Sequence, residues 1–215
     1  MNMGNERRPS MIRKSALFGA AMAVLVALPL FAQTPPDSAR TRIAGTIEKL
    51  DGNVLTVDQP NGPKAAVTLS PGAKIYGVEK RRVAHIKSGD FIASGGVRGT
   101  DGKIHAVELR ILPEALHGRG EGQRPWNAKP DGVMTNATVG TVSQTADGGV
   151  IHVAYQGGES ELTVGPDVPI LAYVPGDPSL LKPGATILTF ALKKPHGSLV
   201  TGRVTVEKDG VKPPM

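Results

Sequence analysis

The fold is decided by a stretch that the chain contains in two related versions, GTIEKLDGNVLTV at residues 45–57 and GTVSQTADGGVIH at residues 140–152. The two versions lie 95 residues apart, and the same offset aligns glycines, prolines and apolar residues further along, beginning with Thr68 and Thr163. A match that keeps one register over this length, with several strand and turn signals in each copy, predicts two copies of one small domain. The shared positions indicate architecture and carry no chemistry.

Each copy has the pattern of short strands joined by tight turns. In the first copy, Ile43–Leu50 alternates loosely and ends at DGN (51–53), a hairpin signal that leads into a second strand. PG at 71–72 is predicted to stop the sheet, and one helical turn is expected near Val83–Ile86. Because long amphipathic helices are absent from the pattern, we expect an all-β fold of two tandem barrels. Each barrel should have five or six strands and be OB-like, meaning of the oligonucleotide/oligosaccharide-binding type.

The predicted organisation has five parts. They are a signal segment at residues 1–32, a first barrel at 40–112, a strap at 113–132, a second barrel at 133–210 and a tail at 211–215. The strap contains the only tryptophan, Trp126, and more hydrogen-bonding side chains than a flexible tether needs. We therefore expect the strap to be ordered.

Residues 1–32 have the pattern of a secretory signal. Basic residues precede an uncharged, mostly apolar run from Ser15 to Phe31, which predicts Sec-type export to the periplasm or the outside of a bacterial cell. The run is shorter than the ~20 apolar residues that a comfortable membrane span needs, so cleavage after Ala32 is expected. Leu30 stands where a small residue is usual, which leaves an uncleaved membrane anchor as the alternative.

Composition limits the chemistry. The chain has no cysteine, which excludes disulfides, a thiolate nucleophile and cysteine metal ligands. After residue 32 there are 21 basic and 18 acidic residues, and the first predicted barrel carries a net charge of +5 while the second carries −2. This asymmetry favours docking of the two barrels, or contact of the first with an anionic partner.

A set of short motifs covers nearly all of the chain after the signal segment. The most distinctive are GEGQRPW at 120–126 and KDGVKPPM at 208–215, and the others lie at 45–49, 52–57, 86–90, 134–139 and 173–177. Together these motifs resemble an uncharacterised family of exported bacterial small-β-barrel proteins that carries a domain-of-unknown-function label. Some relatives are labelled metal ABC transporter permease. The resemblance implies at most an accessory role in metal transport, and it implies no catalytic residues.

The strap contains the candidate ligand or partner site, formed by Arg119, Glu121, Arg124 and Trp126. Two guanidinium groups and an indole suit a carboxylate, a sugar or a partner peptide. In the structural alternative, Arg124 pairs with Glu121 or with the backbone, and Trp126 fills the contact between the barrels.

A metal ion is the one cofactor that the sequence leaves open. His117, with Glu121 and Asp131 nearby, is the only local group that suggests a ligand set, and surface hydrogen bonding is its alternative role. His105 shares a predicted strand face with apolar residues, which predicts a partly buried histidine. No other cofactor is expected.

A basic patch is predicted at Lys80, Arg81 and Arg82. It is expected to be a solvated loop or to contact anionic lipid headgroups or wall polymers. Nucleic acid is not an expected partner, because the central strands at 54–57 and 65–69 lack the aromatic side chains on which bases stack.

No nucleophile elbow, phosphate loop or zinc-protease motif occurs in the sequence. We therefore expect an exported, non-catalytic binding or envelope-structural protein. Its partner would be an envelope protein, a lipid headgroup or a polymer, and it would touch the membrane only through an uncleaved signal. One alternative is an accessory protein of metal handling. The other is an unrecognised envelope enzyme with a site between the barrels.

Overall fold

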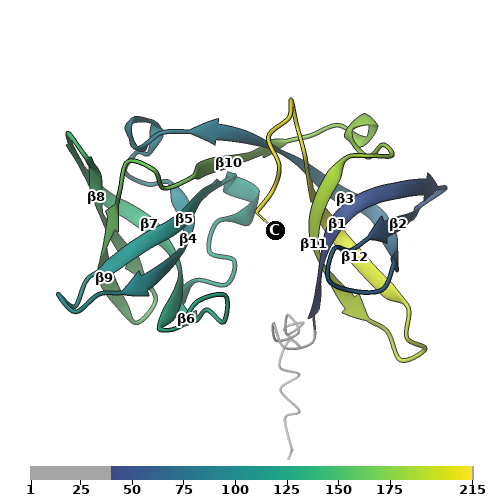
Figure 1. Ribbon diagram of the computed structural model, residues 1–215, viewed down its shortest axis with the longest axis horizontal. Coiled ribbons are helices and arrows are strands. Elements are labelled where there is room, and N and C mark those ends of the chain that lie inside the picture. The colour runs from purple at the N-terminus through teal and green to yellow at the C-terminus, as the bar shows by residue number, and fades with distance from the viewer. Residues whose placement is uncertain (1–39, 215) are drawn as a thin grey trace, which may run out of the picture. The chain divides into compact units, whose positions relative to one another are not determined.

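The computed structural model describes residues 40–214, and this part of the chain is all-β (Figure 1). The strands are β1 (Arg40–Asp51), β2 (Val54–Asp58), β3 (Ala65–Arg81), β4 (Phe91–Arg98), β5 (Ile104–Leu112), β6 (Gly122–Pro125), β7 (Gly132–Thr145), β8 (Gly148–Tyr155), β9 (Gly158–Val164), β10 (Ile170–Pro175), β11 (Thr186–Lys193) and β12 (Leu199–Val206). Three short 3-10 turns connect them: η2 (Val83–His85), η3 (Glu114–Leu116) and η4 (Pro178–Leu180). Over the described residues, no helix is long and apolar enough to cross a membrane. The predicted signal segment and Met215 of the predicted tail lie outside the described residues.

Strands β1, β2, β3, β12 and β11 close a five-stranded barrel, which we call the first ring. Its closing pair joins β12 to β3 in parallel. Alternate side chains point inward, as the two-residue period of a strand requires. Leu55, Val57 and Val67 are among the residues that fill the interior, and each is fully buried.

Strands β4, β5, β9, β8 and β7 pair in a second ring of five. The contact that closes it, between β5 and β9, is short and consists of Ile104 opposite Leu162 and His105 opposite Thr163. Apolar side chains from all five strands form a separate core, with Leu109, Ile151 and Leu162 fully buried.

Each ring takes strands from both predicted copies. The first ring combines β1, β2 and β3 with β11 and β12, whereas the second combines β4 and β5 with β7, β8 and β9. The tandem barrels expected at 40–112 and 133–210 are therefore not confirmed. The physical reason is the crossing of β3 and β10, where residues 76–81 run antiparallel to Ile170–Pro175 and carry the chain from one ring to the other and back (Figure 1).

The length of β3 corrects a second expectation, because this strand of 17 residues continues through Pro71 and Gly72. The ladder with β12 pairs Leu69 with Thr201 and resumes at Lys74 with Arg203, so the residues between them bulge out of the register. Proline has no N–H to donate and Gly72 has a φ of 71°, and both are accommodated where no ladder bond is needed. The bulge lets one strand serve the first ring and the crossing.

A third, smaller apolar cluster lies at the crossing. It joins Tyr76 and Val78 of β3 to Tyr173 of β10 and to Leu116 of η3 in the strap. The strap also contributes β6, which pairs with β7 from Gly122 opposite Asn136 to Pro125 opposite Val133. The strap is thus anchored beside both the crossing and the second ring.

Candidate functional site

A cavity of about 580 Å³ is bounded by both rings and the strap. Its wall includes β1, β11 and β12 of the first ring, β4, β5 and β7 of the second, and residues 119–120 and 124–128 of the strap. We call it the arginine cavity, because six arginines line it: Arg40, Arg42, Arg110, Arg119, Arg124 and Arg203. Its volume falls within the range of roughly 300–1,000 Å³ that is usual for small-molecule sites.

The wall of the arginine cavity is strongly positive. Glu108 is its only acidic residue, and among the described residues no lysine lines it. Glu108 pairs with Arg110 beside it on β5. Within residues 40–214, no carboxylate forms an ion pair with any of the other five arginines. Two of the five bind backbone carbonyl oxygens instead: Arg42 donates to Pro214 at 3.3 Å, and Arg124 donates to Gly120 at 2.9 Å. The cavity therefore carries a net charge of +5 that the described residues leave uncompensated.

The electrostatics of Arg203 reflect this excess. Burial lowers the pKa of Arg203, and repulsion from Arg119 and Arg40 lowers it further against the opposing effect of Tyr173 and Tyr76. An arginine remains charged at neutral pH despite such a shift, so the shift measures the cost of holding the charge there. A bound anion would remove that cost.

Arg110 is in a different environment. Burial opposes its charged form, but the neighbouring Tyr173 and Glu108 outweigh burial, and the pKa of Arg110 is raised. Its guanidinium is thereby held in place on β5.

Four polar atoms in the wall have no hydrogen-bond partner: Nε of Arg40, Nε of Arg110, Oδ1 of Asn136 and the hydroxyl of Tyr173. Asn136 and Tyr173 are only 7% and 8% exposed. Leaving a buried polar group unpaired costs about 1–3 kcal/mol, and such groups are rare in folded proteins. These atoms are buried behind the surface of the wall, so they add to the cost of the buried arginines and do not themselves face the cavity.

The apolar part of the wall includes two of the few aromatic residues of the chain besides Tyr173. Trp126 packs against the backbone of Gly95, where an added Cβ would stand 2.8 Å from Cη2 of the indole. Phe190 of β11 is 41% exposed, which is unusual for a large hydrophobic side chain in this structure. Both line the cavity and offer ring surfaces to a ligand.

The structure brings together three of the four residues that the sequence proposed in the strap. Arg119, Arg124 and Trp126 line the cavity. Glu121 does not, and its Oε1 accepts a hydrogen bond from the backbone N–H of Gln156 at 3.1 Å. Arg124 and Glu121 form no ion pair with each other among the described residues. Each pairs with the backbone, as the structural alternative allowed, since Arg124 donates to the carbonyl oxygen of Gly120 and Glu121 accepts from Gln156.

Sequence analysis missed the remaining four arginines of the cavity. Arg40 and Arg42 lie on β1, Arg110 on β5 and Arg203 on β12, and only the exchange of strands between the rings brings these strands to one cavity. No local motif connects them. The sole sequence signal was the excess positive charge of the first copy.

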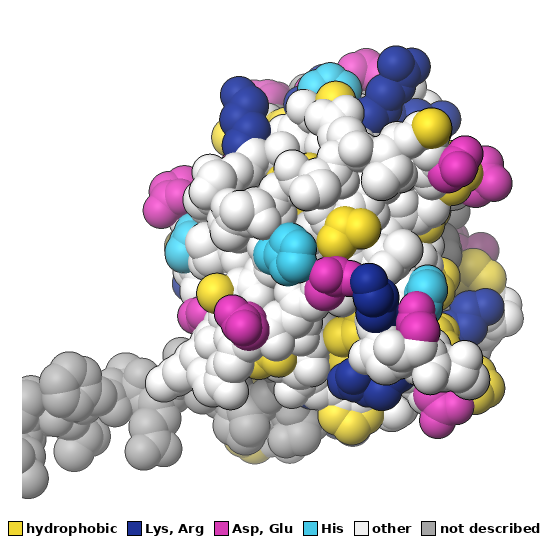
Figure 2. Space-filling view, turned by 90° about the vertical axis from the view of Figure 1, so that its left-hand side faces the viewer, with side chains coloured by type: hydrophobic (Ala, Val, Ile, Leu, Met, Phe, Trp, Pro, Cys, Tyr) yellow, Lys and Arg dark blue, Asp and Glu magenta, His cyan; other side chains and the backbone are white. Residues whose placement is uncertain are grey.

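His117 is not gathered with other metal ligands. Its ring packs against Phe91 with 4.9 Å between centroids, and Nε2 lies 3.5 Å from the hydroxyl of Thr138. Within the part of the chain that the structure describes, no group of three His, Asp or Glu side chains is placed to hold a metal ion. On the face of the second ring shown in Figure 2, the histidine side chains lie apart from one another.

His105 corrects a smaller expectation, because it is exposed rather than partly buried in a barrel. Its Nε2 lies 3.1 Å from Oδ2 of Asp101 in the turn between β4 and β5. The alternation that suggested burial is interrupted by a register shift between Gly95 and Gly96, opposite this part of β5.

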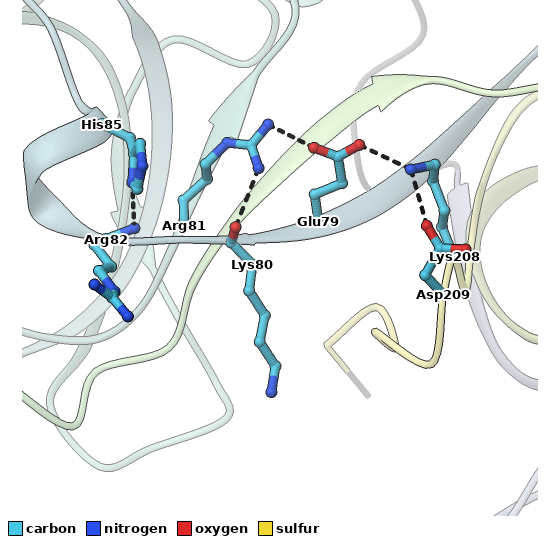
Figure 3. A network of polar contacts seen from close by, with 7 residues as sticks. All are labelled: Glu79, Lys80, Arg81, Arg82, His85, Lys208 and Asp209. Atoms are coloured by element: carbon cyan, nitrogen blue, oxygen red, sulfur yellow. Dashed lines mark hydrogen bonds and ion pairs between the residues drawn. The ribbon is translucent and has the colours of Figure 1, made fainter.

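The predicted basic patch is partly neutralised (Figure 3). Arg81 pairs with Glu79 at 2.5 Å, and Glu79 also accepts from Nζ of Lys208 at 2.9 Å. The backbone N–H of Arg82 donates to Nδ1 of His85 at 3.0 Å. Lys80 lines a second cavity of about 500 Å³, which shares Glu108, Arg110 and Pro214 with the arginine cavity. The three residues therefore do not act as one cationic surface.

No family model matches the chain, and no curated protein or solved structure is significantly similar to it. The geometry of the arginine cavity is therefore the basis on which function is inferred.

Proposed function

We propose that this chain is an exported, non-catalytic binding protein that holds an anionic ligand in the arginine cavity. The observation that carries the proposal is the net charge of +5 of the cavity wall, where five arginines have no carboxylate partner among the described residues. Repulsion between these guanidinium groups favours binding of an anion, because a charge-assisted hydrogen bond contributes about 1.5–3 kcal/mol.

Catalysis is not part of the proposal. Within residues 40–214, Glu108 is the only acid in the wall, and it is paired with Arg110, so it is not free to act as a general base. Among the described residues the wall contains no histidine, and the hydroxyl of Tyr173 has no base beside it. Metal handling has no comparable support, since His117 packs against Phe91.

The proposal also includes the internal repeat and the export suggested by the sequence. β4 begins at Phe91 and β11 at Thr186, and η2 begins at Val83 and η4 at Pro178, each pair being 95 residues apart. This common spacing supports two copies of one OB-like unit that exchanged their last two strands. Residues 1–32 support export, and the motifs after them support kinship with exported small-barrel proteins.

Trp126 provides the test, because it is the only tryptophan and lies in the wall. Purified protein is titrated with phosphate, sulfate, citrate and neutral sugars while Trp126 fluorescence is recorded. We expect a saturable change with at least one anion, weakened about 10-fold or more in Arg119→Gln and Arg203→Gln. Arg98→Gln is the matched control, because Arg98 donates to Gly102 in a hairpin away from the cavity. The proposal fails if no anion binds, or if the cavity variants bind as well as the control.

A further inference from the structure

We propose that the ligand of the arginine cavity is a phosphorylated sugar or cyclic polyol with two or more phosphate groups. This inference rests on the proposed function and names the chemical class of its ligand. It is drawn from the kind of cation in the wall, the number of charges, their distribution over the walls and the aromatic surfaces.

The cations are all arginines. A guanidinium presents a planar fork of donors that matches two oxygens of a phosphate or a carboxylate, whereas a lysine acts as a point charge. Six arginines with no lysine among the described wall residues indicate recognition of oxyanion geometry in addition to attraction of negative charge.

The number of charges favours phosphate over carboxylate. A phosphate monoester carries about −1.5 to −2 at pH 7 and three strong acceptor oxygens. Two such groups contribute about −3 to −4 against the net charge of +5 and three contribute about −4.5 to −6, whereas each carboxylate contributes a single charge. A cavity of about 580 Å³ suits a compact, densely charged molecule better than a large polycarboxylate or a polymer strand.

The arginines are distributed over different walls. Arg40, Arg42 and Arg203 belong to the first ring, Arg110 belongs to the second, and Arg119 and Arg124 belong to the strap. Phosphate groups bound at separate walls require a scaffold that spans the space between them. A single inorganic phosphate would leave most of these guanidinium groups unpaired.

The scaffold also meets aromatic side chains, because Trp126 and Phe190 line the cavity. The apolar face of a sugar or polyol ring would lie on the exposed surface of Trp126 or Phe190.

Such a ligand has two sources with the same chemistry, a free sugar phosphate and a phosphorylated headgroup on a lipid. Both present hydroxyl groups and phosphate groups on one ring. Binding assays with the same headgroup in solution and on a membrane separate the two sources.

The test is isothermal titration calorimetry of the intact protein with glucose 1,6-bisphosphate, inositol 1,4,5-trisphosphate, pyrophosphate and citrate at constant ionic strength. We expect the ring phosphates to bind at least about 10-fold more tightly than citrate and than pyrophosphate. Sedimentation with phosphatidylcholine vesicles that contain phosphatidylinositol 4,5-bisphosphate is the membrane arm. Binding to these vesicles without binding of the soluble ring phosphates would assign the class to a lipid headgroup.

Arg119→Lys and Arg203→Lys keep the charge and remove the fork, so we expect each to weaken binding of the ring phosphates several-fold, with Arg98→Lys as control. Arg119 is exposed, so its variant tests the site even if Arg203→Lys fails to fold. Equal affinity for citrate and the ring phosphates would overturn the ligand class and leave the anion site standing. Absence of binding by every anion and by the vesicles would overturn both. Lysine variants that bind the ring phosphates like the control would overturn recognition by the guanidinium fork, and with it the ligand class.

Discussion

Trp126 rests on Gly95. A Cβ atom at Gly95 would lie 2.8 Å from Cη2, 2.9 Å from Cζ2 and 3.0 Å from Cζ3 of the indole, which is closer than real Cβ contacts allow. Gly95 lies on β4, opposite Met134 of β7, so the missing side chain creates the place on the second ring where the strap docks. This contact positions the indole in the wall of the arginine cavity.

The Gly95→Ala variant tests that contact. The added methyl group must displace the indole, and overpacking of this kind costs about 1–3 kcal/mol. We expect the emission of Trp126 to shift to longer wavelength and the melting temperature to fall by several degrees, measured by fluorescence and circular dichroism. Gly202→Ala is the control, because its Cβ would meet only Oγ of Ser70 at an ordinary 3.4 Å. Unchanged emission in Gly95→Ala would show that the indole does not rest there.

Tyr173→Phe separates stability from binding. The hydroxyl of Tyr173 is buried without a hydrogen-bond partner, so its removal relieves an unpaired group. We expect the melting temperature of the empty protein to stay the same or rise, while affinity for the anionic ligand stays within about twofold, because the hydroxyl is too buried to touch a ligand. A variant that melts several degrees lower would show that this hydroxyl has a stabilising partner.

The Glu79→Gln substitution should make the stability of the fold less dependent on pH in the acid range. Hydrogen bonds from Lys208 and Arg81 lower the pKa of Glu79 in the folded protein. A carboxyl with a lowered folded pKa stabilises the fold above its unfolded pKa of about 4.3, and this contribution is lost as the pH falls through the folded value. The wild type should therefore melt at a higher temperature than Glu79→Gln at pH 7, and the difference should shrink below about pH 4.

The matched control for Glu79→Gln is Glu114→Gln, since Glu114 forms no ion pair within the described residues. A difference between wild type and Glu79→Gln that stays constant from neutral to strongly acidic pH would rule out the ionic contribution of this pair.

The exchange of strands predicts which fragments fold. The second ring is continuous in sequence, because its strands lie between Phe91 and Val164, whereas the first ring needs residues from both ends of the described chain. A fragment of residues 82–169 should unfold cooperatively in urea, measured by circular dichroism. A fragment of residues 40–112, which lacks β11 and β12, should not. Cooperative unfolding of 40–112 would favour tandem barrels.

The sequence predicted most of the strands but not their partners. The turn signal at residues 51–53 located the hairpin between β1 and β2, because glycine and asparagine fix local backbone geometry, as at Gly52, whose φ is 58°. The pairing of strands into rings, in contrast, is not determined by local turn signals. If the copies have equivalent strands with the same inward faces, a hairpin from either copy can complete either meander, so local patterns cannot distinguish the two arrangements.

Only the part of the site that lies within one short segment of sequence could be predicted. The strap presents Arg119, Arg124 and Trp126 within one short segment, and their residue types suggested a site. Arg40, Arg110 and Arg203 lie on strands far apart in sequence and look like ordinary surface arginines until the rings are assembled. Glu121 was included because it is near in sequence, yet its carboxylate faces Gln156.

The most direct test of the anion site is fluorine NMR of protein labelled with 5-fluorotryptophan, which gives a single resonance because Trp126 is the only tryptophan. Glucose 1,6-bisphosphate should shift this resonance saturably, and Arg119→Gln should weaken the response about 10-fold or more while Arg98→Gln leaves it unchanged. A resonance that does not respond to any phosphate or carboxylate ligand, or that responds equally in both variants, would contradict binding in the arginine cavity.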